Sequence, residues 1–230
     1  MSDKKIEQDT RIWADKYQPF TIAECILPKV IKAQFESFVK QKNFPRLLLT
    51  GDPGVGKTST AEALCEEMGL EVTTVNGTKD GNIDFVKNQI RQVCSTISFS
   101  HSKKCIILDE ADGLTKGAQT AMRGTLDDYK HMHFIFICND ASKLDKALHS
   151  RTDVIEFAIQ ESEKDDMINK FSTRVFEILA EEKISFDKGA VNAIIKKYYP
   201  DNRKILNKLQ GACGTEAANG GILLNSKDAA

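Results

Sequence analysis

Short apolar runs alternate with amphipathic stretches up to about residue 157 of the chain. The runs have the length of strands and are rich in Leu, Ile, Val and Phe. This alternation is typical of a parallel sheet covered by helices, and runs that are apolar at nearly every position suit central strands buried on both faces. The predicted strands are 46–50, 71–76, 105–109, 133–138 and 153–157.

Helical periodicity connects these strands. Helices are predicted at roughly 57–68, 82–98 and 115–130, and the second has apolar residues at helical spacing, with Lys87 and Arg91 on its polar face. The predicted fold class is α/β, with a five-stranded parallel sheet and flanking helices.

The pattern changes to helices alone after residue 157, which predicts a domain boundary at 158/159. Ser162 and Asp165 resemble a capping box that opens a long helix, a second helix covers 187–198, and a third follows Pro200. The predicted domains are therefore 1–158, a small helical lid at 159–213, and the start of a further element at 214–230.

Charge and cysteine content limit the classes of function. Lys and Arg total 32 against 33 Asp and Glu, so the net charge is −1 and gives no overall attraction to polyanions. Any polyanion must therefore bind to a local basic patch. The six cysteines are scattered without metal-ligand spacing, which favours a reducing, cytoplasmic setting. We expect no secretory signal and no membrane partner, because no apolar stretch approaches the ~18 residues of a membrane span.

GDPGVGKT at 51–58 carries the strongest chemical signal, because it follows a predicted strand and precedes a predicted helix. Its glycines let backbone amides point at phosphate oxygens, Lys57 would neutralise β- and γ-phosphate charge, and Thr58 would bind Mg²⁺. The alternative is a glycine-rich turn with an incidental lysine. The residues predicted to bind nucleotide here are Gly51, Asp52, Pro53, Gly54, Val55, Gly56, Lys57, Thr58 and Ser59.

CIILDEAD at 105–112 places carboxylates at the end of a buried strand, where ligands bind in this architecture. Asp109 would hold Mg²⁺ through its water shell, and Glu110 would orient or deprotonate the attacking water. A solvated acidic turn is the alternative for this segment alone. Together with the phosphate loop, it predicts hydrolysis of ATP with Mg²⁺ as cofactor.

Three further features follow these motifs along the chain: Asn139 after the fourth strand, a Ser150-Arg151 pair, and Arg203 in a last helix. This order resembles the AAA+ ATPases, and within them the sliding-clamp loaders. WADKYQPFTIAECILP at 13–28 is similar to the opening of replication factor C small subunits. The spacing looks closest to the large subunit of T-even bacteriophage clamp loaders.

The resemblance implies further roles, residue by residue. Asn139 would be the sensor 1 residue, and otherwise belongs to an Asn-Asp turn. Arg203 would be the sensor 2 arginine, and otherwise a solvated helix charge. Asn76 would hold the catalytic glutamate inactive until DNA binds, and Tyr17 would contact the nucleotide. Lys87 and Arg91 would contact DNA phosphates, the alternative being a solvated helix face.

Arg151 would leave its own subunit and complete the nucleotide site of a neighbour. Such an arginine finger contributes roughly 10³ to 10⁵ in rate, so that one chain alone would be a poor ATPase. The alternative is a surface ion pair with Asp153 or Glu156.

Three positions differ from the family pattern: Gln18 replaces an arginine, Gly124 replaces one of two paired arginines, and Thr152 replaces a cysteine. Clamp loaders also carry a helical collar domain, so the resemblance interprets 214–230 as the start of a truncated or absent collar.

The predicted function is the ATPase subunit of a clamp loader, which opens a sliding clamp and loads it on primer-template DNA. Its expected partners are further copies of the ATPase subunit, a small clamp-loader subunit, the clamp and DNA. A P-loop nucleotide kinase and another AAA+ DNA motor, such as a branch-migration helicase, are the alternatives.

Overall fold

The computed structural model describes residues 12–78, 88, 90, 92–93, 103–217 and 223–224. It divides into two compact units. The first is Pro19–Met167, and the second combines the described parts of Met1–Gln18 and Ile168–Ala230.

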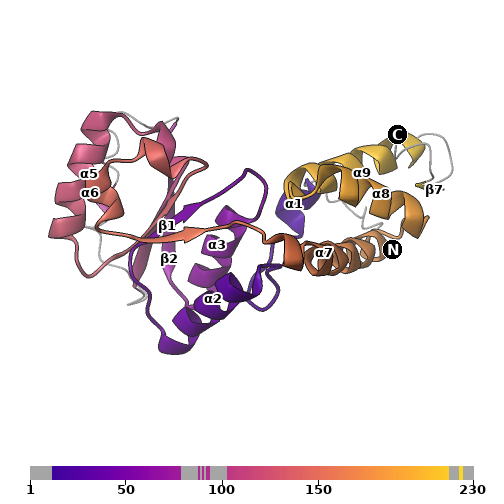
Figure 1. The fold of residues 1–230 in the computed structure, drawn as a ribbon, viewed down its shortest axis with the longest axis horizontal. Helices are drawn as coiled ribbons and strands as arrows, with labels where there is room; N and C mark the ends of the chain where they lie inside the picture. The colour runs from indigo at the N-terminus through magenta and orange to yellow at the C-terminus, as the bar shows by residue number, and fades with distance from the viewer. Residues whose placement is uncertain are drawn as a thin grey trace, which may run out of the picture. The chain divides into compact units, whose positions relative to one another are not determined.

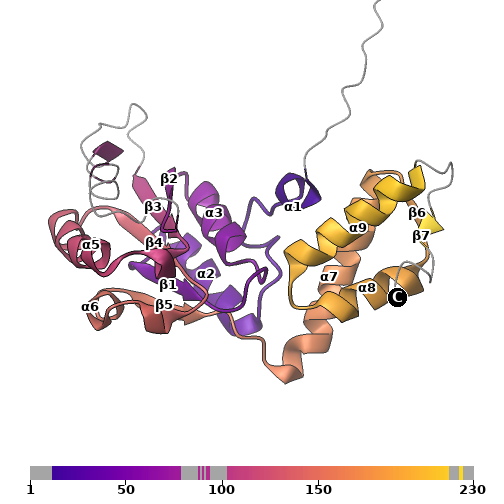
Figure 2. The same ribbon diagram turned by 90° about the horizontal axis from the view of Figure 1, so that it is seen from above.

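A five-stranded parallel sheet forms the centre of the first unit. Figures 1 and 2 show this sheet with helices beside it. Its strand order is β2-β3-β4-β1-β5, and every neighbouring pair is parallel. All five predicted strands are confirmed, with ends that differ by at most one residue. The strands are β1 Leu47–Thr50, β2 Glu71–Asn76, β3 Lys104–Asp109, β4 His133–Ile137 and β5 Asp153–Glu156.

Alternate residues of the central strands supply two separate cores. Leu47, Leu49 and Ile107 pack on the face covered by α2 (Lys29–Gln41) and α3 (Lys57–Glu67). Leu48 and Ile106 pack on the opposite face, against α5 (Lys116–Asp128) and α6 (Lys146–His149). Because side chains alternate along a strand, apolar runs are needed to fill both layers. Two short 3₁₀ turns, η1 (Ala111–Gly113) and η2 (Ala141–Lys143), follow β3 and β4.

Helices make up most of the second unit. They are α1 Trp13–Lys16, α7 Glu161–Glu181, which begins in the first unit, α8 Lys188–Tyr198 and α9 Asn202–Ala217. A short parallel pair joins β6 (Ser185–Phe186) to β7 (Leu223–Leu224). The buried Trp13 ties α1 to α9, because its backbone N–H donates to Gln210 Oε1 at 2.9 Å.

This division differs from the predicted domains at both ends of the chain. Residues 12–18 belong with the helices instead of the sheet. Helix α9 continues through Gly211 to Ala217. Its buried face includes Leu206, Leu209 and Cys213, so apolar burial extends past Gly211. That burial offsets the cost of a helical glycine, about 1 kcal/mol. The described residues of 214–230 therefore extend this unit.

The start of α7 is a second difference. The helix begins at Glu161, so Ser162 lies inside its first turn and is not the N-cap. Glu163 N–H bonds to the carbonyl of Gln160, which places the start of the helix before the expected capping box.

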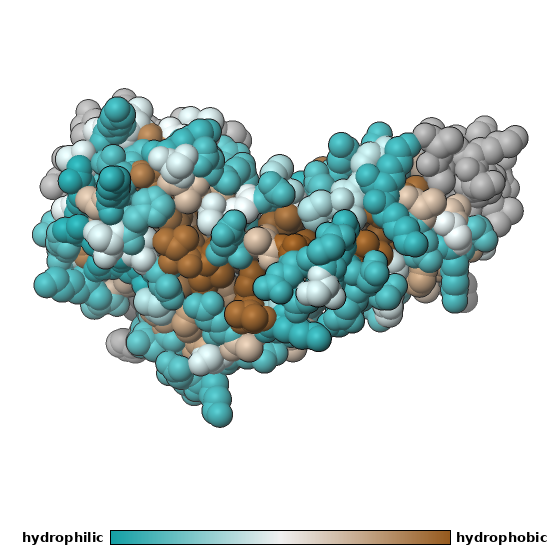
Figure 3. Space-filling model, in the orientation of Figure 1, coloured by the Kyte–Doolittle hydropathy of each residue, from teal (hydrophilic) through white to brown (hydrophobic). Residues whose placement is uncertain are grey.

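Hydrophilic side chains cover much of the face drawn in Figure 3. Large apolar side chains do remain exposed, including Phe20 (68%) and Val30 (72%). The five described cysteines are all buried free thiols. No helix in the described ranges is both long enough and apolar enough to cross a bilayer.

Candidate nucleotide-binding site

The phosphate loop lies between the carboxyl end of β1 and the start of α3. Gly51, Gly54 and Gly56 all have positive φ, which is the conformation that glycine adopts without strain. A Cβ on Gly51 would also lie 3.2 Å from the Cβ of Phe157. Val55 anchors the loop in the core, whereas Asp52 and Pro53 are exposed and Ser59 is half-buried.

Lys57 is the first residue of α3, and it is only 6% exposed. Its ammonium donates to the carbonyls of Gly51 (2.7 Å) and Asp52 (2.8 Å) and to Asn139 Oδ1 (3.0 Å). Burial lowers the pKa of Lys57, while negative groups nearby, Asp109 among them, oppose that shift. The structure thus brings Lys57 and Asn139 together at the carboxyl edge of the sheet.

Thr58 and Asp109 form the second contact across this edge. Thr58 Oγ1 donates to Asp109 Oδ2 at 3.1 Å. A hydroxyl and a carboxylate held side by side are hard oxygen ligands of the type that Mg²⁺ prefers.

Glu110 follows β3 in the left-handed conformation, at φ 51°. Its N–H donates to Asp109 Oδ1 at 2.8 Å, and the residue is exposed. Asn76 ends the neighbouring strand and is the register partner of Asp109. The Asn76 side-chain oxygen accepts the N–H of Thr78 at 2.9 Å. Its role as a partner of the glutamate stays a prediction.

Two glycines that sequence reasoning missed allow the loops after β2 and β3 to pack together. A Cβ on Gly77 would lie 2.4 Å from the carbonyl oxygen of Glu110, and one on Gly113 would lie 2.4 Å from Thr78 Oγ1. Gly77 N–H also donates to the carbonyl of Asp109 at 2.7 Å. The sequence signals for this contact are Gly77, directly after β2, and Gly113, four residues after the end of β3.

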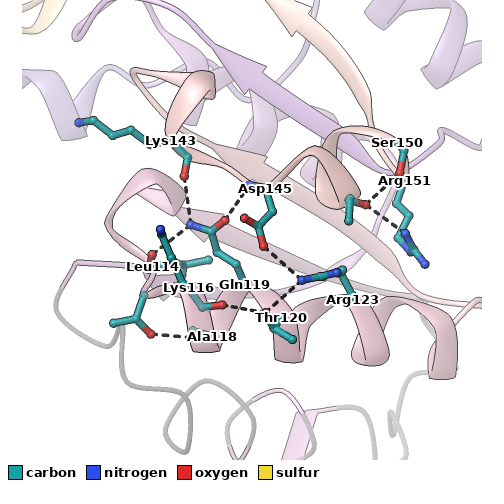
Figure 4. A network of polar contacts seen from close by, with 12 residues as sticks. Leu114, Lys116, Ala118, Gln119, Thr120, Arg123, Lys143, Asp145, Ser150 and Arg151 are labelled. Carbon is teal, nitrogen blue, oxygen red and sulfur yellow. Dashed lines mark hydrogen bonds and ion pairs between the residues drawn. The ribbon is translucent and has the colours of Figure 1, made fainter.

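A buried glutamine, also missed, connects α5 to the segment that leads into α6 (Figure 4). Gln119 donates to the carbonyls of Leu114 (3.1 Å) and Lys143 (3.2 Å), and its Oε1 accepts the N–H of Asp145 (2.8 Å). Arg123 bonds to Asp145 at 3.3 Å beside it. The network fixes the position of α6, which ends two residues before Arg151.

Arg151 pairs with Asp127, not with Asp153 or Glu156 as the alternative expected. Its Nε and Nη2 donate to the two carboxylate oxygens of Asp127 at 3.3 and 3.2 Å, and Nη1 donates to the carbonyl of Ala147 at 3.1 Å. The hydrogen bond with Asp127 raises the pKa of Arg151, and the same bond lowers the pKa of Asp127.

Strand register places Arg151 and the phosphate loop at opposite edges of the sheet. Leu47 is paired with Asp153, and Thr50 with Glu156, in a parallel register. Arg151 therefore precedes the amino end of β5, whereas Gly51 follows the carboxyl end of β1. At about 3.3 Å per residue, the length of β1 alone separates these edges by roughly 10 Å.

The remaining predicted residues lie elsewhere. Tyr17 and Arg203 belong to the second unit, where Tyr17 Oη donates to Glu182 at 2.7 Å and Arg203 is an exposed residue of α9. Burial, with a smaller effect from Glu182, raises the pKa of Tyr17 to about 12. Lys87 and Arg91 lie outside the described residues, so their roles stay predictions.

Comparison with known proteins gives one consistent family. The model of the ATPase family associated with various cellular activities (AAA) matches residues 47–159. A replication factor C small subunit of Sulfolobus acidocaldarius is 34% identical over 87% of this chain and 62% of its own length. The sliding-clamp-loader large subunit of Enterobacteria phage T4 is 34% identical over 95% of this chain and 70% of its own.

Among solved structures, the Thermotoga maritima RuvB Holliday junction branch migration motor superposes with a TM-score of 0.71. It is 15% identical, with 92% of this chain and 70% of that chain covered, a likeness that shows the fold alone. The chain spans about three fifths of the length of the first replication factor C relatives. With the motifs in place and a clamp-loader relative matched over most of its length, the chain belongs to the AAA+ ATPases and, within them, to the sliding-clamp-loader family.

Proposed function

We propose that this chain is an ATP-hydrolysing subunit of a sliding-clamp loader, in which each nucleotide site is completed by the neighbouring copy. The observation that carries the proposal is the placement of Lys57, Thr58, Asp109 and Asn139 at one edge of the sheet, with Arg151 at the other. The relatives with clamp-loader names support this function over a nucleotide kinase or a branch-migration motor.

The phosphate loop fits the triphosphate of ATP. Three glycines in the left-handed region turn the backbone around a cradle at the start of α3, whose helix dipole favours an anion. Lys57, held over the loop by the Gly51 and Asp52 carbonyls, would exchange those contacts for phosphate oxygens. Thr58 and Asp109 would hold Mg²⁺, which neutralises charge on the β- and γ-phosphates when bound.

Glu110 would orient the attacking water and accept its proton. The left-handed backbone at Glu110 lets the chain turn directly after Asp109, so that neighbouring residues serve the metal and the water. Asn139 bonds to the same ammonium that faces the phosphates, which suits a sensor of the γ-phosphate. Arg203, Tyr17 and Asn76 take the roles implied by the family.

Arg151 would act on the triphosphate of a neighbouring copy, because a full strand length separates it from the phosphate loop of its own subunit. An interface that joins the amino edge of one sheet to the carboxyl edge of the next is head-to-tail, and such contacts build rings or spirals. A small clamp-loader subunit, a sliding clamp and primer-template DNA are the other proposed partners, with Lys87 and Arg91 facing DNA phosphates.

Mixing two inactive variants tests the shared site. Lys57→Ala copies lose their own nucleotide but keep Arg151, whereas Arg151→Ala copies keep the nucleotide but lose the finger. We expect each variant alone to hydrolyse ATP at least 10³-fold more slowly than the unmodified chain. Random assembly of an equal mixture should restore about a quarter of the unmodified rate, because one head-to-tail interface in four is complete.

A mixture that is no faster than its components would refute the shared site. Clamp loading is tested separately, by adding a sliding clamp and primed DNA to the unmodified chain with its small subunit. We expect both to raise ATP turnover together. Turnover that ignores both while a nucleoside monophosphate becomes phosphorylated would assign the kinase alternative instead.

A further inference from the structure

Tyr198, the last residue of α8, is surrounded by three lysines. The ammonium nitrogens of Lys197, Lys204 and Lys208 lie 5.7, 5.1 and 6.0 Å from the centre of its ring. The first lysine belongs to α8 and the other two to α9, and these helices contact each other. All three lysines are exposed, whereas the ring is half-buried. These four residues are called the Tyr198 patch.

The sequence around the patch is basic, although the chain as a whole is not. Between residues 188 and 213 the only carboxylate is Asp201, in a chain of net charge −1. The same stretch holds six cations, which are Lys188, Lys196, Lys197, Arg203, Lys204 and Lys208. Within the described part of the chain, no carboxylate forms an ion pair with Lys204 or Lys208. The positive charge is therefore concentrated locally, as a nearly neutral chain requires in order to attract a polyanion.

Folding alone does not favour cations at these positions of α9. The first turn of the helix contains Arg203 and Lys204 and no acidic residue, although the start of a helix carries positive partial charge. Lys204 and Lys208 are one turn apart, at a rise of about 6 Å, where like charges repel. Asp201 Oδ1 accepts the N–H of Lys204 at 2.9 Å and caps the helix. A bound polyanion would relieve the remaining repulsion, which indicates a functional role for these lysines.

The tyrosine ring narrows the class of polyanion. Single-stranded nucleic acid offers phosphates together with unpaired base faces, and proteins bind it by combining basic side chains with an aromatic ring. The Tyr198 patch contains both, because the three ammonium groups lie around one ring. The base faces of a duplex are stacked inside the helix and are not available to a ring on the protein surface. The combination favours a single strand over a duplex or an acidic peptide.

We propose that the Tyr198 patch binds single-stranded nucleic acid, with phosphates at Lys197, Lys204 and Lys208 and a base on the ring of Tyr198. This contact is additional to the DNA contact predicted at Lys87 and Arg91, and it needs no ATP. In a clamp loader the strand would be the unpaired part of the template. That placement rests on the proposed function, whereas the binding itself does not.

Fluorescence anisotropy of a labelled oligothymidylate of about 20 nucleotides tests the patch without ATP. The chain carries Lys87→Ala/Arg91→Ala throughout, so that the other predicted DNA contact does not contribute. We expect Lys197→Ala/Lys204→Ala/Lys208→Ala to weaken binding at least about tenfold in low salt. The slope of log K against log salt concentration should become shallower by about 2, because each phosphate contact contributes about 0.7 for a single strand.

A control variant removes the same charge elsewhere. Lys29→Ala/Lys40→Ala/Lys42→Ala changes three exposed lysines of α2 and its C-terminal end, and should leave the affinity within about twofold. No binding of the oligonucleotide before the patch lysines are removed, or an equal loss in the control, would overturn the proposal.

Two further measurements identify the ligand. Tyr198→Leu keeps an apolar side chain but removes the ring, and should weaken binding at least about fivefold with an unchanged salt slope. An unlabelled single strand should compete at least about fivefold better than a duplex of the same length or polyglutamate of equal charge. Equal competition by either, or unchanged affinity in Tyr198→Leu, would overturn the assignment to a single strand. Strand binding at the patch in a chain whose ATP turnover ignores clamp and primed DNA would support the patch and reject its placement in a clamp loader.

Discussion

Gly77→Ala should displace the catalytic segment without touching a catalytic side chain. A Cβ at this buried position would stand 2.4 Å from the carbonyl oxygen of Glu110, about 1 Å short of ordinary contact at 3.4 Å. The obstacle is backbone, so it cannot turn aside as a flexible side chain would. Overpacking of this kind costs about 1 to 3 kcal/mol, and a shift of about 1 Å in a reacting group can cost on the order of 10²-fold in rate.

Equilibrium urea unfolding, binding of a fluorescent ATP analogue and steady-state ATP turnover measure these effects on one preparation. We expect lower stability, nucleotide affinity within about threefold of the unmodified chain, and turnover reduced on the order of 10²-fold. Gly124→Ala is the control, because a Cβ there meets nothing within 4 Å in the middle of α5. It should stabilise the chain by about 0.5 to 1 kcal/mol. Unchanged stability and turnover in Gly77→Ala would refute the close approach of the two loops.

Three other changes test separate parts of the account. Mg²⁺ should raise the affinity of the unmodified chain for ATP, and Thr58→Ala should remove most of this increase. Titration of each protein with ATP, with and without Mg²⁺, measures it. An undiminished increase in Thr58→Ala would exclude Thr58 as a Mg²⁺ ligand. Gln119→Leu should lower the free energy of unfolding by about 2 to 4 kcal/mol, because it leaves the Lys143 carbonyl and the Asp145 N–H without this partner; a loss below about 0.5 kcal/mol would contradict that. Burial lowers the pKa of His133 below its ordinary 6.5, so the native state resists protonation and the free energy of unfolding should fall as the pH drops below 6.5. The urea midpoint of His133→Gln should fall less over the same pH range than that of the unmodified chain. An equal fall in both proteins would refute this role of His133.

The sheet was predictable because its strands must be apolar on both faces. Consecutive apolar residues such as those from Leu47 to Leu49 satisfy two cores at once, and this leaves a signal that periodicity detects. The end of α9 was not predictable in the same way. Glycine is a poor helix former, so Gly211 gives no local signal that the helix continues. It continues because Cys213 reaches a buried position, and burial depends on tertiary contacts.

The candidate site shows the same division between local and long-range information. Lys57, Thr58 and Asp109 were predicted because the phosphate-loop and acidic-strand motifs each carry their own chemistry within a few residues. The partner of Arg151 was missed, since Asp127 comes from α5 and is brought near only by the packing of α5 beside α6. The roles of Gly77 and Gln119 also depend on neighbours far along the chain, which a single sequence does not identify.

The structure of the assembled chain with Mg²⁺ and a non-hydrolysable ATP analogue tests the shared catalytic site most directly. We expect the Arg151 guanidinium to leave Asp127 and to lie within about 3.2 Å of a phosphate oxygen bound to the phosphate loop of the adjacent copy. An assembly in which Arg151 remains paired with Asp127, away from every bound triphosphate, would contradict the shared site.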